Sequence, residues 1–401
     1  MAMGGSNKFN VAIVTFPLKK SGFTPLENLA DIVDLISENF CIVSGIILGD
    51  RKEAYTDRRE LTNILEKRKR LSRSHINSKN ICVYIIEHKP RSTKLTRIIS
   101  YLYTQLKITL AVVKNLKKID LWIFFIGGEG LLLPILIVKI FKKKPILAFA
   151  GSGRQVADAK NDSLVKFLSF LSKINCTLAN RIILYSPNLI KEWNFEKYRN
   201  KILIAHEHFL DFDKFEIKKK LSERNNSVGY IGRLSEEKGV LNFVRAIPEI
   251  LKERNDMEFL IGGDGQLRGE IEKYISGKNL NDKVKLAGWI PHEKLPDYLN
   301  ELKLVVLPSF TEGLPNIMLE AMACGTPVLA TPVGAIPDVI TDGETGFIME
   351  NNSPECIARN VMRALKHPNL ERIAENARAL VEREFTYEKA VERWRGILKT
   401  I

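Results

Sequence analysis

LVVLPSFTEGLPNIMLEAMACGTPV, residues 304–328, begins with four apolar residues, Leu304–Leu307, which predict a buried strand. A loop follows, and then a short apolar helix that Asn316 is expected to cap and Gly325 to end in a left-handed conformation. Strand, loop and helix in this order form the repeating unit of parallel α/β sheets. The stretch therefore predicts a doubly wound α/β fold.

Two carboxylates flank the start of this predicted helix: Glu312 precedes it and Glu320 lies one turn inside. The amides of Ile317, Met318 and Leu319 are expected to lack intrahelical partners there, and such a helix end attracts phosphate. Carboxylates accept hydrogen bonds from the paired hydroxyls of a ribose or a hexose. The arrangement favours a nucleotide sugar as ligand. The alternative is that both glutamates only stabilise the helix dipole.

The spacing of Glu312 and Glu320 resembles the E-x7-E signature of retaining glycosyltransferases of the GT-B fold, family four (glycosyl transferases group 1), with its usual form E-G-x-P-x-x-x-x-E. Residues 321–328, AMACGTPV, resemble that family's continuation. The resemblance implies two Rossmann-like, doubly wound domains facing a central cleft. It implies that Glu312 holds sugar hydroxyls and Glu320 the ribose. The donor-binding loop between them would contain Gly313, Leu314, Pro315 and Asn316.

Residues 232–239, GRLSEEKG, resemble the family's G-R-L-x-x-x-K-G element. The resemblance implies that Arg233 and Lys238 clamp the donor diphosphate, with Gly232 at the start of the loop. Arginine offers oxygens a fork of N–H groups and lysine a point charge, and both stabilise charge developing on a leaving phosphate. The alternative is a solvated loop with two exposed cations.

Two further segments resemble the family's donor site. Residues 262–265, GGDG, resemble its G-x-G turn, in which Gly263 lets the backbone approach the ligand. The segment that meets the nucleobase in the family corresponds here to Gly288, Trp289 and Ile290. Trp289 is expected either to stack on the base or to belong to the core.

The N-terminal half resembles the family by architecture only. Gly22 aligns with the glycine-rich loop over the phosphates and is included among the donor-binding residues. The two loops in which the family has histidines, here residues 124–129 and 148–153, contain none. Glu129 is therefore predicted as a substitute polar group on the acceptor side, and His206 or His208 is an alternative.

Residues 206–213, HEHFLDFD, combine H-x-H with D-x-D and raise the possibility of a metal site. Residues 209–215 align with the family's G-V-D-x-x-x-F crossover loop, which holds no metal. The expectation is therefore that no metal and no cofactor is required.

At 401 residues the chain is expected to form two domains. The boundaries predicted are 1–218 for an acceptor domain and 219–385 for a nucleotide-sugar donor domain, with a helix over 386–401 packing back on the first. The polar segment 216–226 is expected to be a linker. The predicted strands of the first domain are 9–16, 41–48, 81–87, 121–126, 145–150 and 181–185, and those of the second include 227–231, 257–261, 284–287 and 304–307.

Five scattered cysteines, without a C-x-x-C pair, favour reduced thiols, and no secretory signal is recognised; a cytoplasmic protein is expected. The net charge is +14, and residues 51–150 alone hold 22 Lys and Arg against 7 Asp and Glu. This excess predicts an anionic partner. Residues 92–118 form a predicted basic amphipathic helix that favours the inner face of the cell membrane; the alternative is a core-facing helix with solvated lysines. No motif supports nucleic-acid binding.

Together these features predict a retaining hexosyltransferase that uses a UDP- or GDP-sugar and a lipid-linked or membrane-proximal acceptor. The resemblance implies front-face attack, in which the leaving phosphate takes the acceptor's proton. A sugar-nucleotide epimerase of the same fold is the main alternative, and a non-catalytic lipid-binding scaffold is a weaker one.

Overall fold

The computed structural model describes residues 9–18, 23–47, 81–88, 93–151 and 163–401. These form two compact units, each described by itself below. The N-terminal unit comprises the described parts of 1–185, 189–208 and 388–401, and the C-terminal unit comprises 186–188 and 209–387. All five cysteines are free thiols.

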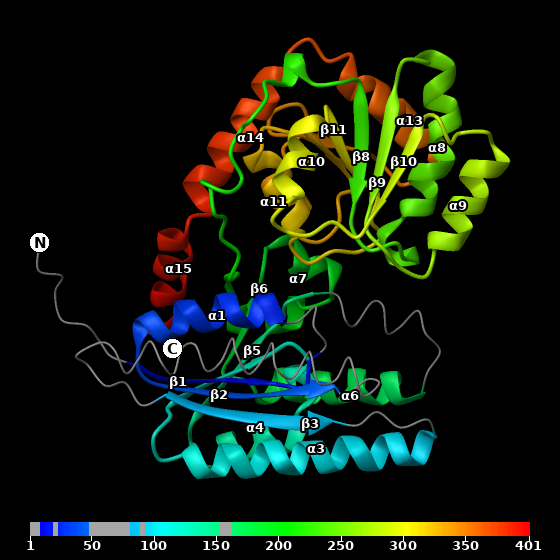
Figure 1. Cartoon of the computed structure of the whole chain (residues 1–401). Coiled ribbons are helices and arrows are strands. Elements are labelled where there is room, and N and C mark those ends of the chain that lie inside the picture. Colours follow the sequence, from blue (N-terminus) through cyan, green and yellow to red (C-terminus); the bar gives the residue numbers. More distant parts are fainter. Residues whose placement is uncertain (1–8, 19–22, 48–80, 89–92, 152–162) are drawn as a thin grey trace, which may run out of the picture. The chain divides into compact units, whose positions relative to one another are not determined.

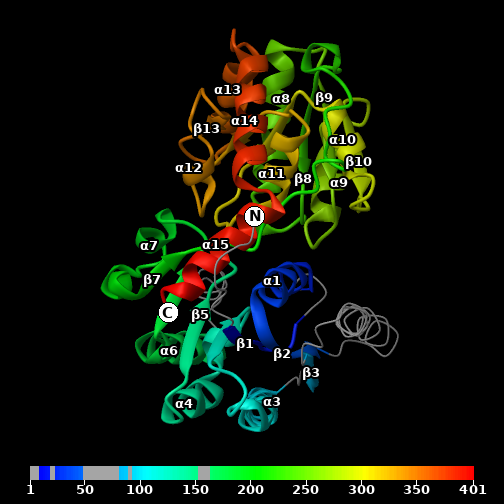
Figure 2. The same ribbon diagram turned by 90° about the vertical axis from the view of Figure 1, so that its left-hand side faces the viewer.

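The N-terminal unit is built on a seven-stranded parallel sheet of order β3-β2-β1-β4-β5-β6-β7. Its strands are β1 (Phe9–Thr15), β2 (Ser37–Ile47), β3 (Ile81–His88), β4 (Leu121–Phe125), β5 (Lys144–Ala148), β6 (Arg181–Leu184) and β7 (Ile202–Ile204). Its helices are α1 (Phe23–Ile36), α3 (Lys94–Asn115), η2 (Gly128–Gly130), α4 (Leu132–Ile140), α6 (Ser163–Leu178), η3 (Glu196–Lys201) and α15 (Tyr387–Lys399), and α7 (Asn188–Glu192) begins at the junction with the other unit. Helix α1 lies on one face of the sheet, and α3, α4 and α6 lie on the other (Figures 1 and 2).

The C-terminal unit has a six-stranded parallel sheet of order β10-β9-β8-β11-β12-β13. Its strands are β8 (Ser227–Ile231), β9 (Glu258–Gly262), β10 (Val284–Gly288), β11 (Leu304–Leu307), β12 (Val328–Ala330) and β13 (Phe347–Ile348). Its helices are η4 (Leu221–Glu223), η5 (Glu236–Lys238), α8 (Val240–Glu253), α9 (Arg268–Gly277), α10 (Leu295–Glu301), α11 (Asn316–Ala323), α12 (Ile336–Val339), α13 (Pro354–Leu365) and α14 (Leu370–Glu384).

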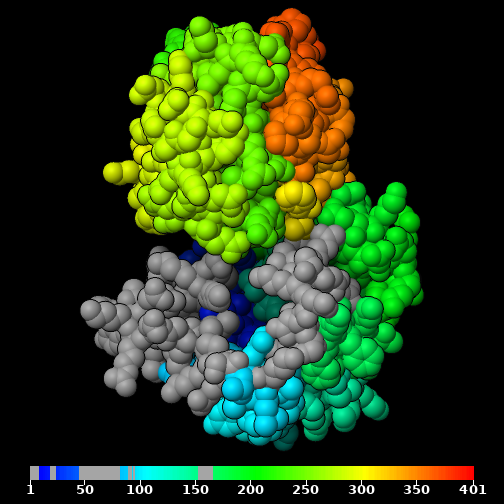
Figure 3. Space-filling model, turned by 90° about the vertical axis from the view of Figure 1, so that its right-hand side faces the viewer, coloured from blue at the N-terminus to red at the C-terminus, as the bar shows by residue number. Residues whose placement is uncertain are grey.

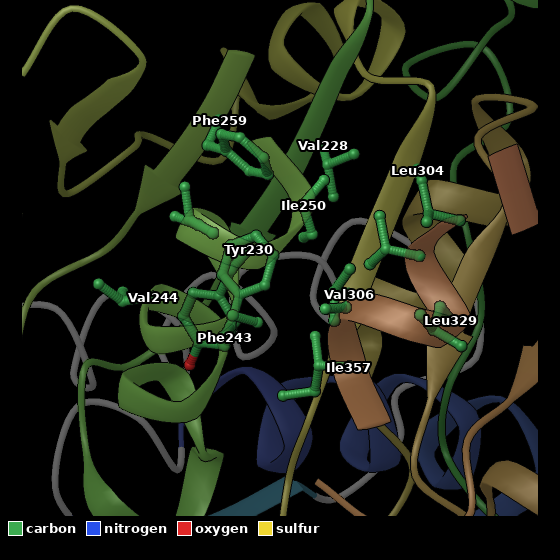
Figure 4. Close-up of a cluster of buried hydrophobic side chains, with 14 of the residues drawn as sticks. Val228, Tyr230, Phe243, Val244, Ile250, Phe259, Leu304, Val306, Leu329 and Ile357 are labelled. Atoms are coloured by element: carbon green, nitrogen blue, oxygen red, sulfur yellow. The ribbon is translucent and has the colours of Figure 1, made fainter. Parts of the chain in front are cut away.

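Every residue of β8 and β11 is buried, because helices cover both faces of the sheet. Figure 4 shows the core on one face, where Phe243 of α8 and Ile357 of α13 lie close to side chains of β8, β9 and β11. The predicted fold is confirmed: both units are doubly wound parallel sheets, and two predicted strands, Ser227–Ile231 and Leu304–Leu307, have the predicted bounds.

The segment 216–226, expected to be a linker, instead packs onto the C-terminal unit. Arg224 is only 3% exposed, and its guanidinium donates hydrogen bonds to the carbonyl oxygens of Leu302 and Cys324. The side-chain amide of Asn300 bonds the backbone of the segment twice: its oxygen accepts from the amide of Lys218, and its nitrogen donates to the carbonyl oxygen of Glu216. These bonds attach the segment to α10 and to the end of α11, and the C-terminal unit already begins at Phe209, upstream of residue 219.

Helix α15 belongs to the N-terminal unit. Trp394 is 1% exposed, and its Nε1–H donates to the carbonyl oxygen of His206 at 3.1 Å. A buried indole with a satisfied N–H fixes the helix in place.

Candidate active site

The site of the C-terminal unit lies where the strand order of its sheet reverses. Strands β8 and β11 are neighbours in the sheet, with Leu304 opposite Val228, although two other strands separate them in the sequence. Loops that leave the carboxyl ends of such strands diverge and leave room for a ligand. Here these are the loops 232–239 and 308–315, which sequence analysis singled out independently.

The loop 232–239 reaches the loop after β11 through Gly239. This glycine has a φ of +66°, and a Cβ on it would lie 1.9 Å from the carbonyl oxygen of Pro308. The amide of Phe310 also donates to the carbonyl oxygen of Glu237 at 2.9 Å. Any larger residue at 239 would separate the two loops, so glycine is required for their contact.

Lys238 and Glu312 form the central ion pair of the site. The Nζ of Lys238 lies 2.7 Å from Oε1 of Glu312, and the hydroxyl of Ser309 donates to the same oxygen at 2.7 Å. The side chain of Glu312 is 8% exposed and that of Lys238 is 26% exposed. The carboxylate is thus held in one position by two donors from two loops.

Arg233 supplies a second cation on the same loop as Lys238. Its carbonyl oxygen accepts a hydrogen bond from the hydroxyl of Tyr230 at 2.7 Å, and burial holds the pKa of that phenol above its usual range. Its guanidinium is 61% exposed and makes one long contact, 3.5 Å, with Glu237. The backbone is therefore fixed while the charged end stays accessible to an anion.

Glu320, on α11, is bonded to a residue that sequence analysis did not identify. Its Oε1 lies 2.7 Å from Nε2 of His292, and the Nζ of Lys214 lies 2.8 Å from Nδ1 of the same ring. A lysine ammonium can only donate, so Nδ1 accepts and Nε2 carries the hydrogen that bonds Glu320. The only signal in the sequence was the position of His292, three residues after Trp289.

The start of α11 differs from the prediction. The N-cap residue is Pro315, with extended backbone and no side-chain cap, whereas Asn316 is the first helical residue and is exposed. The amide of Met318, expected to lack a partner, donates to the carbonyl oxygen of Pro315 at 3.1 Å. Pro315 takes the cap position because its ring disfavours helical geometry in the preceding residue. Gly325 ends the helix with a φ of +63°, as predicted.

The remaining predicted donor residues surround the same strand ends. The amide of Gly263 donates to the carbonyl oxygen of Gly288 at 2.6 Å, which joins the turns after β9 and β10. Trp289 is 71% exposed, so the alternative that it belongs to the core is wrong. The side chain of Ile290 packs over Gly262, where a Cβ would lie 2.6 Å from it. The amide of Gly232 donates a hydrogen bond to the carbonyl oxygen of Gly262. In the loop after β11, the carbonyl oxygen of Gly313 accepts a hydrogen bond from the amide of Ala335, and the side chain of Leu314 is buried.

Residues 211–380 match the family model described as Glycosyl transferases group 1. Over these residues, which are less than half of the chain, the sequence is similar to that family. All the predicted donor-site residues just described lie within the match. The group 1 assignment was predicted from the sequence and is confirmed.

Two curated relatives illustrate the range of this similarity. Alpha-D-kanosaminyltransferase of Streptomyces kanamyceticus is 34% identical over 212 residues, which cover 51% of this chain and 55% of that protein. The capsular polysaccharide biosynthesis glycosyltransferase CapM of Staphylococcus aureus is 26% identical over 339 residues, which cover 78% of this chain and 88% of CapM. The chain thus spans about half the length of the first relative.

A solved structure shares the fold over nearly the whole chain. HepE of Anabaena, crystallised with UDP, superposes with a TM-score of 0.72 at 16% identity, over 97% of this chain and 100% of HepE. The two Rossmann-like units are those of the GT-B glycosyltransferases.

In the N-terminal unit, Glu129 lies at the corresponding position of its own sheet. It follows β4, which is the neighbour of β1 where the strand order reverses, and its carbonyl oxygen accepts a hydrogen bond from Asn175 at 2.8 Å. Gly22 and the end of the loop 148–153 lie outside the described residues. The position of Glu129 suits a ligand contact.

The H-x-H segment is built into the core. His206 and His208 are 7% and 8% exposed, and the intervening Glu207 accepts a hydrogen bond from the Tyr185 hydroxyl at 2.6 Å. Burial raises the pKa of Glu207 to about 7 and lowers that of His206. Among the residues that the structure describes, no cluster of three or more His, Cys, Asp or Glu side chains could hold a metal ion.

Proposed function

We propose that this chain is a retaining glycosyltransferase that moves a hexose from a nucleotide-diphosphate sugar to an acceptor. The observation that carries the proposal is the Lys238–Glu312 pair at the reversal point of the second sheet, with Arg233 on the same loop as Lys238. The match of residues 211–380 to the group 1 family supports transfer chemistry.

Each side chain of the site has a role in this proposal. Arg233 and Lys238 bind the diphosphate, Glu320 accepts hydrogen bonds from the ribose hydroxyls, and Glu312 accepts them from the hexose. Cleavage of the bond between the anomeric carbon and the phosphate oxygen leaves an additional negative charge on the diphosphate. Lys238, which Glu312 holds in place before the reaction, and the accessible guanidinium of Arg233 stabilise that charge.

Retention of configuration follows from attack on the same face that the leaving group departs from. The acceptor hydroxyl forms the new bond to the anomeric carbon, and its proton passes to the departing phosphate oxygen. No protein nucleophile takes part. We also propose that no metal or other cofactor is needed, since Arg233 and Lys238 supply the positive charge.

The choice of donor and acceptor to test can be limited to certain chemical classes. HepE, which has the same fold, binds UDP-glucose, so UDP-glucose is the first donor to test and GDP-sugars are the alternative. We propose a lipid-linked or membrane-proximal acceptor, contacted by Glu129 of the N-terminal unit. The protein would then work in the cytoplasm at the inner face of the cell membrane.

A donor screen with product analysis tests this function. The purified full chain is incubated with UDP- and GDP-sugars, with and without lipid-linked glycan acceptors, in buffer containing a chelator. We expect sugar transfer only when acceptor is present, with the anomeric configuration of the donor retained in the product as seen by NMR. Conversion of the donor sugar into an epimer without acceptor would overturn the proposal in favour of an epimerase. Loss of transfer in chelator, restored by manganese, would overturn the metal-free mechanism.

A further inference from the structure

The outer face of helix α3 is apolar and exposed to solvent. Seven aliphatic side chains, at steps of three or four residues except for the adjacent Ile98 and Ile99, are between 41% and 68% exposed: Leu95, Ile98, Ile99, Leu102, Leu106, Leu110 and Val113. Their spacing places them along one side of the helix, over about 27 Å from Leu95 to Val113. Soluble proteins rarely leave so continuous an apolar stripe uncovered. The cyan atoms of α3 form part of the surface in Figure 3.

The opposite side of α3 faces the sheet and carries polar side chains with partners. The hydroxyl of Thr104 lies 2.8 Å from Nδ1 of His88 on β3, and Oε1 of Gln105 accepts the amide hydrogen of Leu133 at 3.0 Å. The hydroxyl of Tyr101 donates to the carbonyl oxygen of Gly130. Turning the apolar stripe inward would break these bonds and leave buried polar groups unpaired. The sequence-based alternative, a helix whose apolar stripe faces the core, is therefore wrong.

The two helices beside α3 extend the exposed apolar surface. Helix α4 packs against α3 and against α6, and the three lie on the same side of the sheet (Figure 2). Leu133 and Ile140 of α4, with Phe141 after it, are 41%, 68% and 57% exposed. Phe167 and Phe170 of α6 are 45% and 58% exposed. We call the exposed side of α3, α4 and α6 the outer helical face.

The charge of the outer helical face has one sign. Residues 93–118, 132–140 and 163–178, which include α3, α4 and α6, contain no Asp or Glu, whereas they contain six, one and two Lys or Arg. On α3, Lys107 and Lys114 each follow a member of the apolar stripe, and Nζ of Lys107 lies 4.4 Å from the ring centre of Tyr103. Cations at the border of an apolar stripe complement anionic headgroups above a hydrocarbon layer.

We infer that the outer helical face lies in the interface of an anionic lipid bilayer, with α3 parallel to the membrane plane. The apolar stripe enters the boundary between headgroups and acyl chains, and the lysines contact lipid phosphates. Within the described ranges, none of the helices combines the length and the apolarity that crossing a membrane requires. The inference does not depend on which sugar the protein transfers.

Flotation of the full chain with vesicles tests this inference. Vesicles of phosphatidylcholine alone are compared with vesicles that contain phosphatidylglycerol as well, at low and at high salt. We expect binding to the anionic vesicles that weakens with salt, since screening shortens the reach of surface charge. The double variant Leu102→Asn with Leu106→Asn should lower the bound fraction about tenfold or more.

The matched control is Leu35→Asn on α1, which is 54% exposed and lies on the opposite face of the same sheet. We expect wild-type vesicle binding from this control and unchanged thermal unfolding from all variants, because the replaced side chains are exposed. Wild-type vesicle binding by the double variant would overturn the inference, as would equal binding to neutral vesicles. A concentration-dependent dimer that the double variant abolishes, without vesicle binding by the wild type, would assign the face to a second copy instead.

Discussion

Lys238 Nζ lies 2.7 Å from Glu312 Oε1, and this contact joins the loops after two strands, β8 and β11, that are adjacent in the sheet but 73 residues apart from the end of one to the start of the next. In the proposed function, a diphosphate and a hexose meet at this pair. Such an arrangement lowers the entropy that a catalytic site loses when substrate binds. Glu312 accepts a hydrogen bond from one N–H of the Lys238 ammonium group. The other N–H groups can donate to the diphosphate of the donor.

Replacement of Lys238 by Gln should lower the transfer rate on the order of a hundredfold, because it removes a charge partner of the leaving diphosphate. The variant also leaves Glu312 without its cation, so thermal unfolding is measured alongside the rate. Lys252→Gln is the control, as Lys252 is 72% exposed and pairs with Glu249 in the same helix. A wild-type transfer rate in Lys238→Gln would show that Lys238 takes no part in the reaction.

Glu320→Ala and Glu312→Ala should differ in the kinetic constant that they affect. Loss of a charged acceptor costs about 1.5–3 kcal/mol, or roughly tenfold to a hundredfold. For Glu320 we expect this loss in donor affinity, since ribose is bound before and during the reaction. For Glu312 we expect it mainly in turnover. Nucleotide titration measures the donor affinity, and steady-state kinetics measure the turnover. Wild-type affinity and turnover in both variants would refute the proposed roles of Glu312 and Glu320.

His292 should act on the donor through Glu320. Its Nε2–H bonds Oε1 of Glu320 and restricts the rotation of that carboxylate. His292→Ala should weaken nucleotide binding about two- to tenfold, which corresponds to one ordinary hydrogen bond. In the Glu320→Ala background the same change should have little further effect, because the interaction is already lost. Additive losses in the double variant would show that His292 acts independently.

The buried Glu207 should make stability depend on pH. Burial raises its pKa from 4.5 to about 7, so the folded protein favours the neutral carboxyl group. The contribution is fully present below pH 4.5, where the unfolded chain is protonated as well, and it is lost as pH rises from 4.5 to about 7. Compared with Glu207→Gln, the wild type should therefore lose about 1.4 kcal/mol of unfolding free energy for each pH unit in that window. Denaturant unfolding measured from pH 4.5 to 8 checks this, and parallel curves for the two proteins would contradict it.

The long apolar strands of both sheets could be predicted because their burial leaves a direct pattern in the sequence. Strands β12 and β13 have only three and two residues, so their existence depends on pairing with neighbours rather than on their own composition. The same holds for β7, with three residues. These short strands had no local signal that a sequence could show.

The site residues that lie together in one short motif could be predicted from the sequence. Contacts between residues from distant segments could not. Arg233, Lys238, Glu312 and Glu320 fall in short motifs. The contact of His292 with Glu320 depends on the positions of the segment after β10 and of helix α11, which the sequence does not specify. Helix α3 shows a further limit: its apolar stripe was visible, but the direction it faces depends on partners such as His88 on another strand.

The central claim is that the loops after β8 and β11 bind a nucleotide-diphosphate sugar, and calorimetric titration of UDP-glucose and of GDP-sugars tests it most directly. The full chain is compared with Arg233→Ala and with the control Arg245→Ala, a half-exposed arginine of α8 that pairs with Glu270. We predict saturable binding of one of these donors to the wild type and to the control, and affinity at least about tenfold lower for Arg233→Ala. Equal affinity of the Arg233 variant, or no binding of any donor to the wild type, would contradict the account.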